Sequence, residues 1–384
     1  MELRAWKAAL ARCGYTVLPG FADVHVHLRE PGFSYKETIL TGTRAAARGG
    51  YTAVCAMPNL DPAPDSPQGL APQLALIQRD ACVTVKPYGC ITLGQKGRTL
   101  ADLEGLAPLV CGYSDDGHGV ADGGLMREAM VRAKALGKPI AAHCEDTAYP
   151  PEDPASEWRE AERNIALALD TGCALHICHV SSRVTLELVR QGKRAGADLS
   201  CETAPHYLLL DETLRQDSGD WKMNPPLRAP ADREALAEGL ADGTVDMVAT
   251  DHAPHAPVEK AGGFAASLNG VTGLECAFPV LYTGLVLPGH LRLEQLLHAL
   301  SAAPRARFRL PVGRDCTVFA LGEAEAVKPE GFLSMGKSTP FAGMPVHGRC
   351  LLTLAGGSPV WQDPAWGALC AKMGVPETPE GGSQ

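Results

Sequence analysis

Eight short runs of apolar and β-branched residues recur along the first 308 residues, and stretches with the 3.6-residue spacing of helices separate most of them. The predicted strands are residues 21–28, 51–57, 83–91, 109–114, 139–144, 174–180, 197–203 and 245–250. The predicted helices are residues 37–48, 125–136, 156–169, 183–194 and 231–240. Strands that alternate with helices form parallel sheets, and eight such units close into a barrel. The sequence therefore predicts an α/β fold, a (β/α)₈ TIM-type barrel over residues 20–308.

The pattern changes after the barrel. Short strands with Gly/Pro turns are predicted at residues 316–321, 349–354 and 358–361, and residues 15–18 are expected to add a strand from the other chain end. We therefore divide the chain into four predicted parts. They are an N-terminal segment of a β appendage (1–19), the catalytic barrel (20–308), a small, reduced β-sandwich (309–361) and a C-terminal tail (362–384).

Charge and composition narrow the function classes. The net charge is −9, whereas nucleic acids and anionic membranes attract basic surfaces, so neither is the expected partner. No apolar run approaches the ~20 residues of a membrane span. Glu2, Arg4 and Lys7 leave no apolar core for a secretory signal. The 13 cysteines form no CxxC pair and have apolar neighbours, which is typical of reduced core residues in a cytoplasmic protein.

Histidines and acids gather at predicted strand ends. His25 and His27 are two residues apart in the first strand, so their imidazoles point to one side, at the barrel end where active sites lie. His143 and His179 end two later strands, and Asp251 follows the eighth. Each of these residues alone could be a buried core residue whose polar atoms are hydrogen-bonded. Together they indicate a metal centre with nitrogen and oxygen ligands, which suits zinc and tolerates manganese or cobalt.

Polar residues near these strand ends extend the candidate site. Asp115 and Asp116 close the fourth strand, where one could bridge two metals and the other cap a turn; the alternative is a plain Asp-Gly turn. Arg29 lies on the face of the histidine pair and could clamp a carboxylate, or pair with a neighbouring glutamate on the surface. Asn59 and Asn224 follow the second and seventh strands in proline-stiffened loops and could orient a small polar ring, or simply form turns.

The region after Asp251 is dense in chemistry-bearing residues. The run Asp251-His-Ala-Pro-His255 contains two histidines, of which not both need be functional. A glycine-rich stretch with Gly262-Gly263 and Gly270…Gly273 follows, and it could shape a pocket wall. This stretch is not a phosphate-binding loop, because residues 251–273 contain no GxxxxGK[ST] motif.

These motifs together resemble the dihydroorotases, specifically the bacterial type I branch of the amidohydrolase superfamily. The resemblance runs from about residue 18 to 361 and keeps the family's order. It is carried by His25-Val-His-Leu-Arg-Glu-Pro-Gly32, Met57-Pro-Asn59, Ser114-Asp-Asp-Gly117, Ala142-His-Cys-Glu145, Cys178-His-Val-Ser-Ser182, Asn224-Pro-Pro-Leu-Arg228 and Thr250-Asp-His-Ala-Pro-His255.

The resemblance implies a role for each site residue. It implies two Zn²⁺ ions per subunit, a bridging ligand, a proton shuttle and a substrate-binding set. The implied metal ligands are His25, His27, His143, His179, the bridging Asp116, and Asp251, which is also the catalytic proton shuttle; the implied substrate-binding residues are Arg29, Asn59, Asn224 and His255. The implied reaction is the reversible cyclisation of N-carbamoyl-L-aspartate to L-dihydroorotate in de novo UMP synthesis, in the cytoplasm. A homodimer and association with aspartate transcarbamoylase are the implied assemblies.

Two other functions stay open at this point. One is another cyclic amidohydrolase, a hydantoinase or allantoinase, although those commonly bridge their metals with a carboxylated lysine, and the motif at residues 114–116 offers aspartates. The other is a non-catalytic scaffold for aspartate transcarbamoylase, although such chains tend to lose ligands that this one keeps. The chain departs from the family pattern in a short segment before His25, a short connection over 145–156 and a loose match over 268–275.

Overall fold

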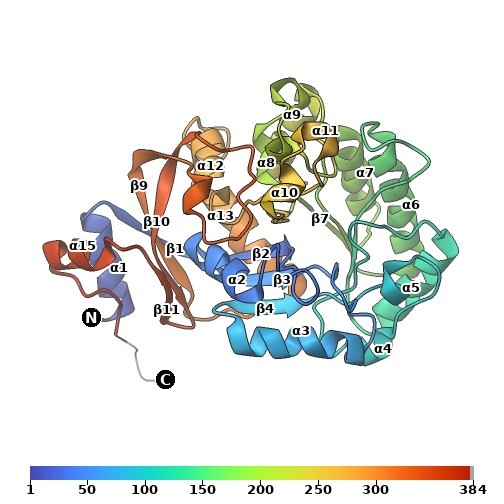
Figure 1. Cartoon of the computed structure of the whole chain (residues 1–384), viewed down its shortest axis with the longest axis horizontal. Helices are drawn as coiled ribbons and strands as arrows, with labels where there is room; N and C mark the ends of the chain where they lie inside the picture. The colour runs from blue at the N-terminus through green and yellow to red at the C-terminus, as the bar shows by residue number, and fades with distance from the viewer. Residues whose placement is uncertain (381–384) are drawn as a thin grey trace.

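Seven parallel strands and one bridging segment enclose a barrel in the computed structural model, which describes residues 1–380 (Figure 1). The barrel strands are β2 (Phe21–Val26), β3 (Tyr51–Ala56), β4 (Thr84–Pro87), β5 (Ile140–Ala142), β6 (Leu175–Ile177), β7 (Leu199–Thr203) and β8 (Met247–Val248). A parallel bridge between Val26 and His252 closes the ring. The predicted barrel fold is therefore confirmed.

The fourth strand position is shorter than predicted. Instead of a strand over 109–114, Tyr113 alone forms parallel bridges, to Gly89 on one side and Ile140 on the other. The backbone still pairs with both neighbours, since Cys111 N–H donates to Pro87 O at 3.0 Å and Tyr113 N–H donates to Pro139 O at 3.0 Å. The segment thus fills the fourth position without a continuous ladder.

Helices cover the outside of the barrel. They are α2 (Ile39–Arg48), α3 (Pro67–Asp80), α4 (Leu103–Leu106), α5 (Gly123–Ala135), α6 (Ala155–Thr171), α7 (Arg183–Arg194), α8 (Pro205–Leu209), α9 (Pro230–Asp242), α10 (Pro257–Lys260), α11 (Gly263–Ala266), α12 (Ala277–Leu281), α13 (Leu293–Leu297) and α14 (Ala303–Phe308). The five predicted helices are present; α7 has the predicted ends, and the other four have shifted ends. Helix α3 was not predicted; Pro67 occupies its first turn, where a missing N–H costs little, and Pro72 lies further along it.

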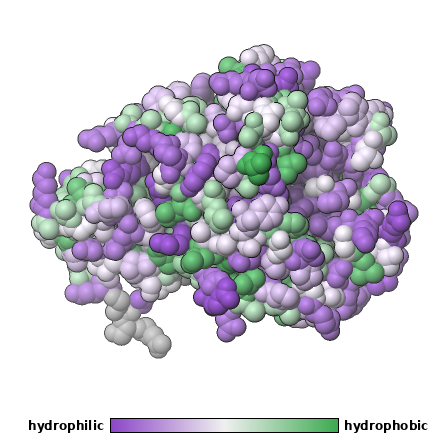
Figure 2. All heavy atoms as spheres, in the orientation of Figure 1, coloured by the Kyte–Doolittle hydropathy of each residue, from purple (hydrophilic) through white to green (hydrophobic). Residues whose placement is uncertain are grey.

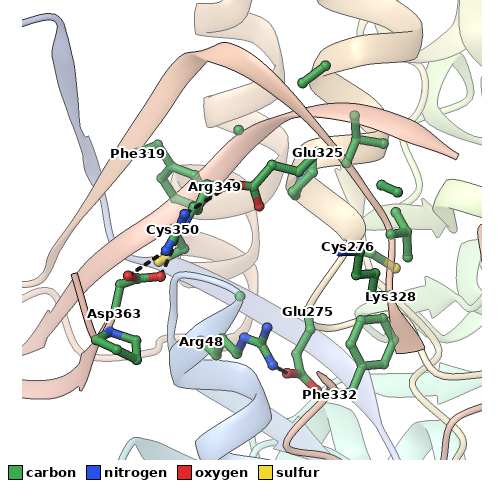
Figure 3. A pocket seen from close by; sticks show the side chains of 18 residues that line it. Arg48, Glu275, Cys276, Phe319, Glu325, Lys328, Phe332, Arg349, Cys350 and Asp363 are labelled. Carbon is green, nitrogen blue, oxygen red and sulfur yellow. Dashed lines mark hydrogen bonds and ion pairs between the residues drawn. The ribbon is translucent and has the colours of Figure 1, made fainter. Parts of the chain in front are cut away.

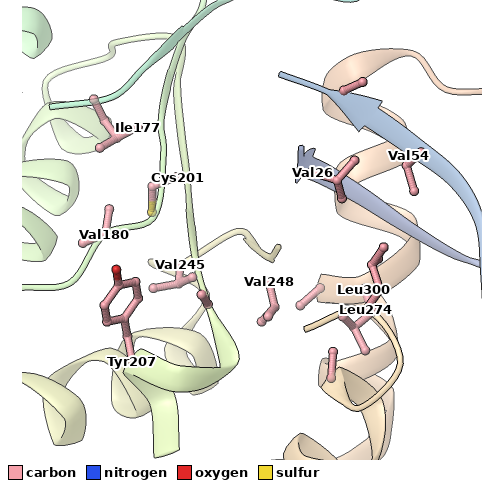
Figure 4. Close-up of a cluster of buried hydrophobic side chains, with 14 of the residues drawn as sticks. Val26, Val54, Ile177, Val180, Cys201, Tyr207, Val245, Val248, Leu274 and Leu300 are labelled. Carbon is pink, nitrogen blue, oxygen red and sulfur yellow. The ribbon is translucent and has the colours of Figure 1, made fainter. Parts of the chain in front are cut away.

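Two apolar layers hold the barrel together. Inside it, mostly small side chains such as Ala22, Cys55, Ala141 and Cys178 leave little room, and Phe308 lies at the base of this layer. Outside, larger branched side chains pack between the strands and the helices (Figure 4). Hydrophilic residues cover most of the face that Figure 2 shows. Within residues 1–380, no helix is both long and apolar enough to span a bilayer.

The chain ends build one antiparallel sheet in the order β1 (Tyr15–Pro19), β9 (Cys316–Ala326), β10 (Pro345–Ala355) and β11 (Ser358–Gln362). Helices α1 (Leu3–Arg12) and α15 (Trp366–Met373) cover its outer face, where a second sheet was expected (Figure 1). The predicted tail is therefore folded at least through α15, because Trp6 and Trp366 are fully buried there. The tail's last residues, 381–384, lie outside the described part of the chain.

A cavity of about 790 Å³ lies between this sheet and the barrel (Figure 3). Its charged side chains are largely paired: Arg48 binds Glu275 at 3.0 Å, and Arg349 binds Asp363 at 2.7 Å and Glu325 at 3.1 Å. None of the predicted site residues lines it. The cavity is a seam between two parts of the fold, and the candidate chemistry lies elsewhere.

Candidate active site

The carboxyl ends of the barrel strands bring the predicted metal ligands together around Asp116. Its Oδ1 lies 3.4 Å from His25 Nε2, 3.5 Å from His179 Nε2 and 3.6 Å from His143 Nδ1. Its Oδ2 lies 3.5 Å from His27 Nε2. Residues far apart in the sequence therefore meet at one mouth of the barrel, because parallel strands end at the same edge.

Asp251 completes this cluster from the end of β8. Its Oδ1 lies 3.2 Å from His27 Nε2 and 3.6 Å from His25 Nε2. All six side chains are buried. The six predicted metal ligands thus occupy one compact polar centre, in which each carboxylate contacts imidazole nitrogens.

The donor set fits divalent cations. His25 Nε2 and Asp116 Oδ1 are buried without a hydrogen-bond partner, and such atoms cost free energy unless a ligand satisfies them. Among the six predicted ligands, two sets of three donors converge closely enough to hold an ion: His25, His27 and Asp251, and His25, Asp116 and His179; a third set joins His25 to Cys178 and Glu202. His143 Nδ1 lies 2.8 Å from His179 Nε2, so those two nitrogens also face a common point. Imidazole and carboxylate donors suit zinc.

Both carboxylates are negatively charged at neutral pH. Burial raises the pKa of Asp251, but the hydrogen bond with His27 and the charges of the nearby histidines outweigh it and lower the pKa to about 2. Burial likewise opposes ionisation of Asp116, yet the charge of His25 and hydrogen bonds from His143 and His179 hold its pKa well below the usual range. Both carboxylates are therefore available as anionic ligands.

Three site residues have left-handed backbone conformations. Arg29, His179 and Asp251 have φ values of 59°, 37° and 47°. Residues with a Cβ adopt this region at a cost of about 1–2 kcal/mol each, and such strain gathers at functional sites. The strain aims these side chains into the mouth of the barrel, where a regular strand end would direct them elsewhere.

A cavity of about 160 Å³ opens over the polar centre. The predicted substrate residues Arg29, Asn59 and Asn224 line it, together with Asn269 and Gly270. Asn59 donates to Asp116 O at 2.6 Å, which ties this loop to the centre. Asn224 donates to Glu145 Oε2 at 3.0 Å. Three of the four predicted substrate residues thus face the same small volume as the metal ligands.

His255 lies behind Arg29 rather than on the cavity surface. Arg29 Nη2 lies 3.5 Å from His255 Nε2, and Arg29 Nε donates to Pro254 O at 3.2 Å. Burial and the charge of Arg29 lower the pKa of His255 to about 4, so this imidazole is neutral at physiological pH. His252 points away from the cavity, with its Nε2 3.5 Å from Glu37 Oε2.

The structure adds carboxylates that the motif analysis did not select. Glu202 accepts a hydrogen bond from His25 Nδ1 at 2.7 Å and another from His176 Nε2 at 3.1 Å. Glu145 accepts from His143 Nε2 at 2.9 Å. One signal was available for Glu202, because it is a carboxylate within a predicted buried strand, where an unpaired charge is not tolerated.

The adjacent residues Asp115 and Asp116 have different roles in the structure. Asp115 accepts from Ile91 N at 2.8 Å and Thr92 N at 3.2 Å, so it caps a turn. Asp116 faces the histidines. Two further histidines that were not predicted as site residues, His176 and His206, are also buried.

Comparisons with known proteins point to one family. A family model described as Dihydro-orotase-like matches residues 14–163. The dihydroorotase of Geobacillus thermodenitrificans is 46% identical, and that of Geobacillus sp. (strain WCH70) is 44% identical; each alignment covers 91% of this chain and 88% of the relative. Among solved structures, an L-hydantoinase (dihydropyrimidinase) from Arthrobacter aurescens superposes with a TM-score of 0.82 at 25% identity, over 91% of this chain and 86% of its own. A D-hydantoinase from Bacillus sp. AR9 shares the fold, with a TM-score of 0.80.

Proposed function

This chain belongs to the dihydroorotase family of cyclic-amide hydrolases, and from that premise we propose that it interconverts N-carbamoyl-L-aspartate and L-dihydroorotate. The observation that carries the proposal is the convergence of four histidines and two aspartates beneath a cavity that Arg29 and two asparagines line. A cyclic amide that bears a carboxylate needs both features.

We propose zinc at this centre, with one ion held by His25 and His27, a second by His143 and His179, and Asp116 between them. Asp251 would contact one of the ions. Bound divalent cations would supply a water of lowered pKa and a polarised amide carbonyl.

Asp251 is proposed to move the proton. In the hydrolytic direction, water adds to the ring amide carbonyl carbon, the C–N bond breaks and the ring nitrogen gains a proton. A carboxylate with a pKa of about 2 is unprotonated at neutral pH, so it can accept the proton of the attacking water and deliver it to the leaving nitrogen. In the synthetic direction the same carboxylate performs the reverse transfer.

Arg29 is proposed to hold the substrate carboxylate. Its side chain is half-buried and lines the cavity beside the polar centre, and a guanidinium binds carboxylates through two parallel hydrogen bonds. Asn59 and Asn224 stand on other parts of the cavity wall and would orient the ring amides. Fixing the ring in this way keeps the reacting carbonyl over the metal ligands. His255, placed behind Arg29, would support the carboxylate-binding side.

The substrate panel is the direct test. Purified protein loaded with zinc should hydrolyse dihydroorotate much faster than hydantoin or allantoin, and elemental analysis should find close to two metals per chain. Faster turnover of hydantoin or allantoin would assign the chain to the alternative amidohydrolases. Full metal content without any turnover would instead favour a scaffold. A variant of the exposed His118, H118Q, serves as the control for loss of a histidine outside the centre.

The biological setting is also a proposal. Cytoplasmic de novo pyrimidine synthesis, a homodimer and an association with aspartate transcarbamoylase follow from the resemblance. Size measurement of the purified protein, alone and mixed with the transcarbamoylase, tests the two assemblies.

A further inference from the structure

Lys260, at the end of α10, is buried, yet it forms no ion pair within the described residues. A buried lysine is usually paired with a carboxylate. Here the ammonium donates to three backbone carbonyls, Gly270 O at 2.7 Å, Leu268 O at 2.8 Å and Lys222 O at 3.1 Å. All three of its donors are therefore used on the backbone.

The three carbonyls belong to two segments of the active-site wall. Residues 268–270 contribute Asn269 and Gly270 to the cavity lining, and Lys222 stands two residues before Asn224. Gly270 N–H also donates to Lys222 O at 2.9 Å, so the two segments touch directly. The ammonium thus joins the wall that carries Asn224 to the wall that carries Asn269.

The held segment also fixes the proton of His255. Asn269 O lies between the two anchored carbonyls, 2.7 Å from His255 Nε2. A carbonyl only accepts, so the neutral imidazole carries its proton on Nε2. Its Nδ1 lies 3.4 Å from Lys36 Nζ and 3.3 Å from Glu259 Oε2, and Lys36 and Glu259 are themselves paired at 2.9 Å. Lys260 therefore acts on His255 through the position of Asn269.

The backbone around Lys260 is closely packed at two glycines, where a side chain would not fit. A Cβ at Gly219 would lie 2.2 Å from Lys260 O, and a Cβ at Gly270 would lie 2.5 Å from Ala253 O. Gly270 also has a φ of 137°, which side chains other than glycine rarely adopt. The neighbouring stretch 261–267 contains little regular structure apart from the one-turn helix α11. The three ammonium hydrogen bonds add to the few backbone bonds that hold this wall, such as Leu268 N–H to Glu259 O at 3.0 Å and Gly270 N–H to Lys222 O at 2.9 Å.

We propose that Lys260 is a positioning residue that sets substrate affinity by holding the Asn224 and Asn269 walls in their binding geometry. The proposal rests on the proposed function, because substrate affinity is its readout. It explains why a glycine-rich stretch can form one wall of a small, defined cavity. Without Lys260 the substrate would have to order both segments on binding, which weakens affinity more than it slows the chemical step.

The test is a steady-state comparison of K260M with the wild type. Methionine keeps the length and apolar stem of the side chain but removes its three donors. The KM for dihydroorotate should rise about tenfold, whereas kcat should stay within about threefold. The matched control is K138M, which removes a half-buried ammonium that donates to Val110 O at 2.6 Å near the opposite mouth of the barrel. Its KM should be unchanged.

A KM of K260M within about twofold of the wild type, in folded protein, would overturn the proposal. The proposal would also be overturned if kcat of K260M falls in proportion to the folded fraction while KM is constant, because loss of a residue that only stabilises the fold has this effect. Absence of dihydroorotate turnover in the wild type would instead overturn the proposed function. In that case, or if K260M does not fold, ¹⁵N NMR of His255 in the wild type and K260R decides. The Nε2–H tautomer in the wild type, with a His255 signal that changes in K260R because the larger guanidinium cannot keep all three carbonyl contacts, supports the proposal. An identical His255 signal in both proteins, or the Nδ1–H tautomer in the wild type, refutes it.

Discussion

Replacing Glu202 by glutamine should weaken metal binding although Glu202 is not a predicted ligand. In the wild type, His25 Nδ1–H donates to Glu202 Oε1 at 2.7 Å, which leaves Nε2 free to face Asp116 and Asp251. Burial raises the pKa of Glu202, but the charges and hydrogen bonds of His25 and His176 outweigh it and lower the pKa to about 2. The carboxylate is therefore charged throughout the physiological range and makes His25 a more basic ligand.

The size of the effect follows from the geometry. E202Q preserves the shape, because the amide oxygen can still accept from His25. The amide nitrogen would face His176, which can change tautomer, since its Nδ1 lies 2.8 Å from a hydroxyl, Ser200 Oγ, that can donate or accept. The substitution thus removes mainly the charge. Outer carboxylates of this kind contribute 10- to 100-fold to metal affinity, or about 1.4–2.8 kcal/mol, and full burial places Glu202 toward the upper end.

The assay is competition with a chelator of known zinc affinity, read as the dissociation constant of the protein–zinc complex. Thermal melting of the metal-free proteins should show that both are folded. S200A is the matched control. Ser200 belongs to the same hydrogen-bond chain, which runs from His25 through Glu202 and His176 to Ser200, but it does not contact His25. The zinc affinity of S200A should therefore stay within about threefold of the wild type. Equal zinc affinity of folded E202Q and wild type would refute the role given to Glu202.

Three further predictions concern the site. D251N should lose nearly all turnover but retain metal by elemental analysis, and normal turnover would exclude it as the proton carrier. R29A should raise the KM for dihydroorotate by 10-fold or more, roughly the worth of a charge-assisted hydrogen bond pair, and an unchanged KM would remove the carboxylate clamp. Burial lowers the pKa of His206 to about 4, so between pH 6.5 and 4 the unfolded chain binds a proton that the folded chain resists. The free energy of unfolding should therefore fall as pH falls through that window, by up to about 3 kcal/mol. The pH at which half of the protein is acid-unfolded, measured by circular dichroism on metal-free protein, should be lower for H206F than for the wild type. Coincident acid transitions of the two proteins would count against this.

Residues that the strand pattern controls could be predicted from sequence. His25 and His27 follow from the two-residue period of a strand, and His143, His179 and Asp251 from their positions at strand ends. Parallel strands in a barrel end at one mouth, so identifying the strands was enough to gather these side chains. The two-residue period of the strands and the parallel order of the barrel were sufficient to predict that these side chains meet, without any knowledge of side-chain contacts.

Residues that depend on tertiary contacts could not be predicted in this way. Asp115 and Asp116 are adjacent and chemically identical, and only the position of the 91–92 turn decides which of them caps it. Helices α1 and α15 are short, and their stability comes from burial of Trp6 and Trp366 against the appended sheet. Lys260 has no motif at all, because its partners are backbone carbonyls that any residue could supply.

The appended sheet also reaches the active site, which gives it a role beyond closing one end of the barrel. Asp251 faces the histidines while the next residue, His252, faces the segment that links β9 to β10. There Ser334 donates to Glu37, whose Oε2 lies 3.5 Å from His252 Nε2, and His252 O accepts from His27 N at 2.8 Å. The strained Asp251 is therefore held between a barrel strand on one side and a loop of the appended sheet on the other. A barrel cut off before this loop would lose a contact that keeps its proton carrier in place.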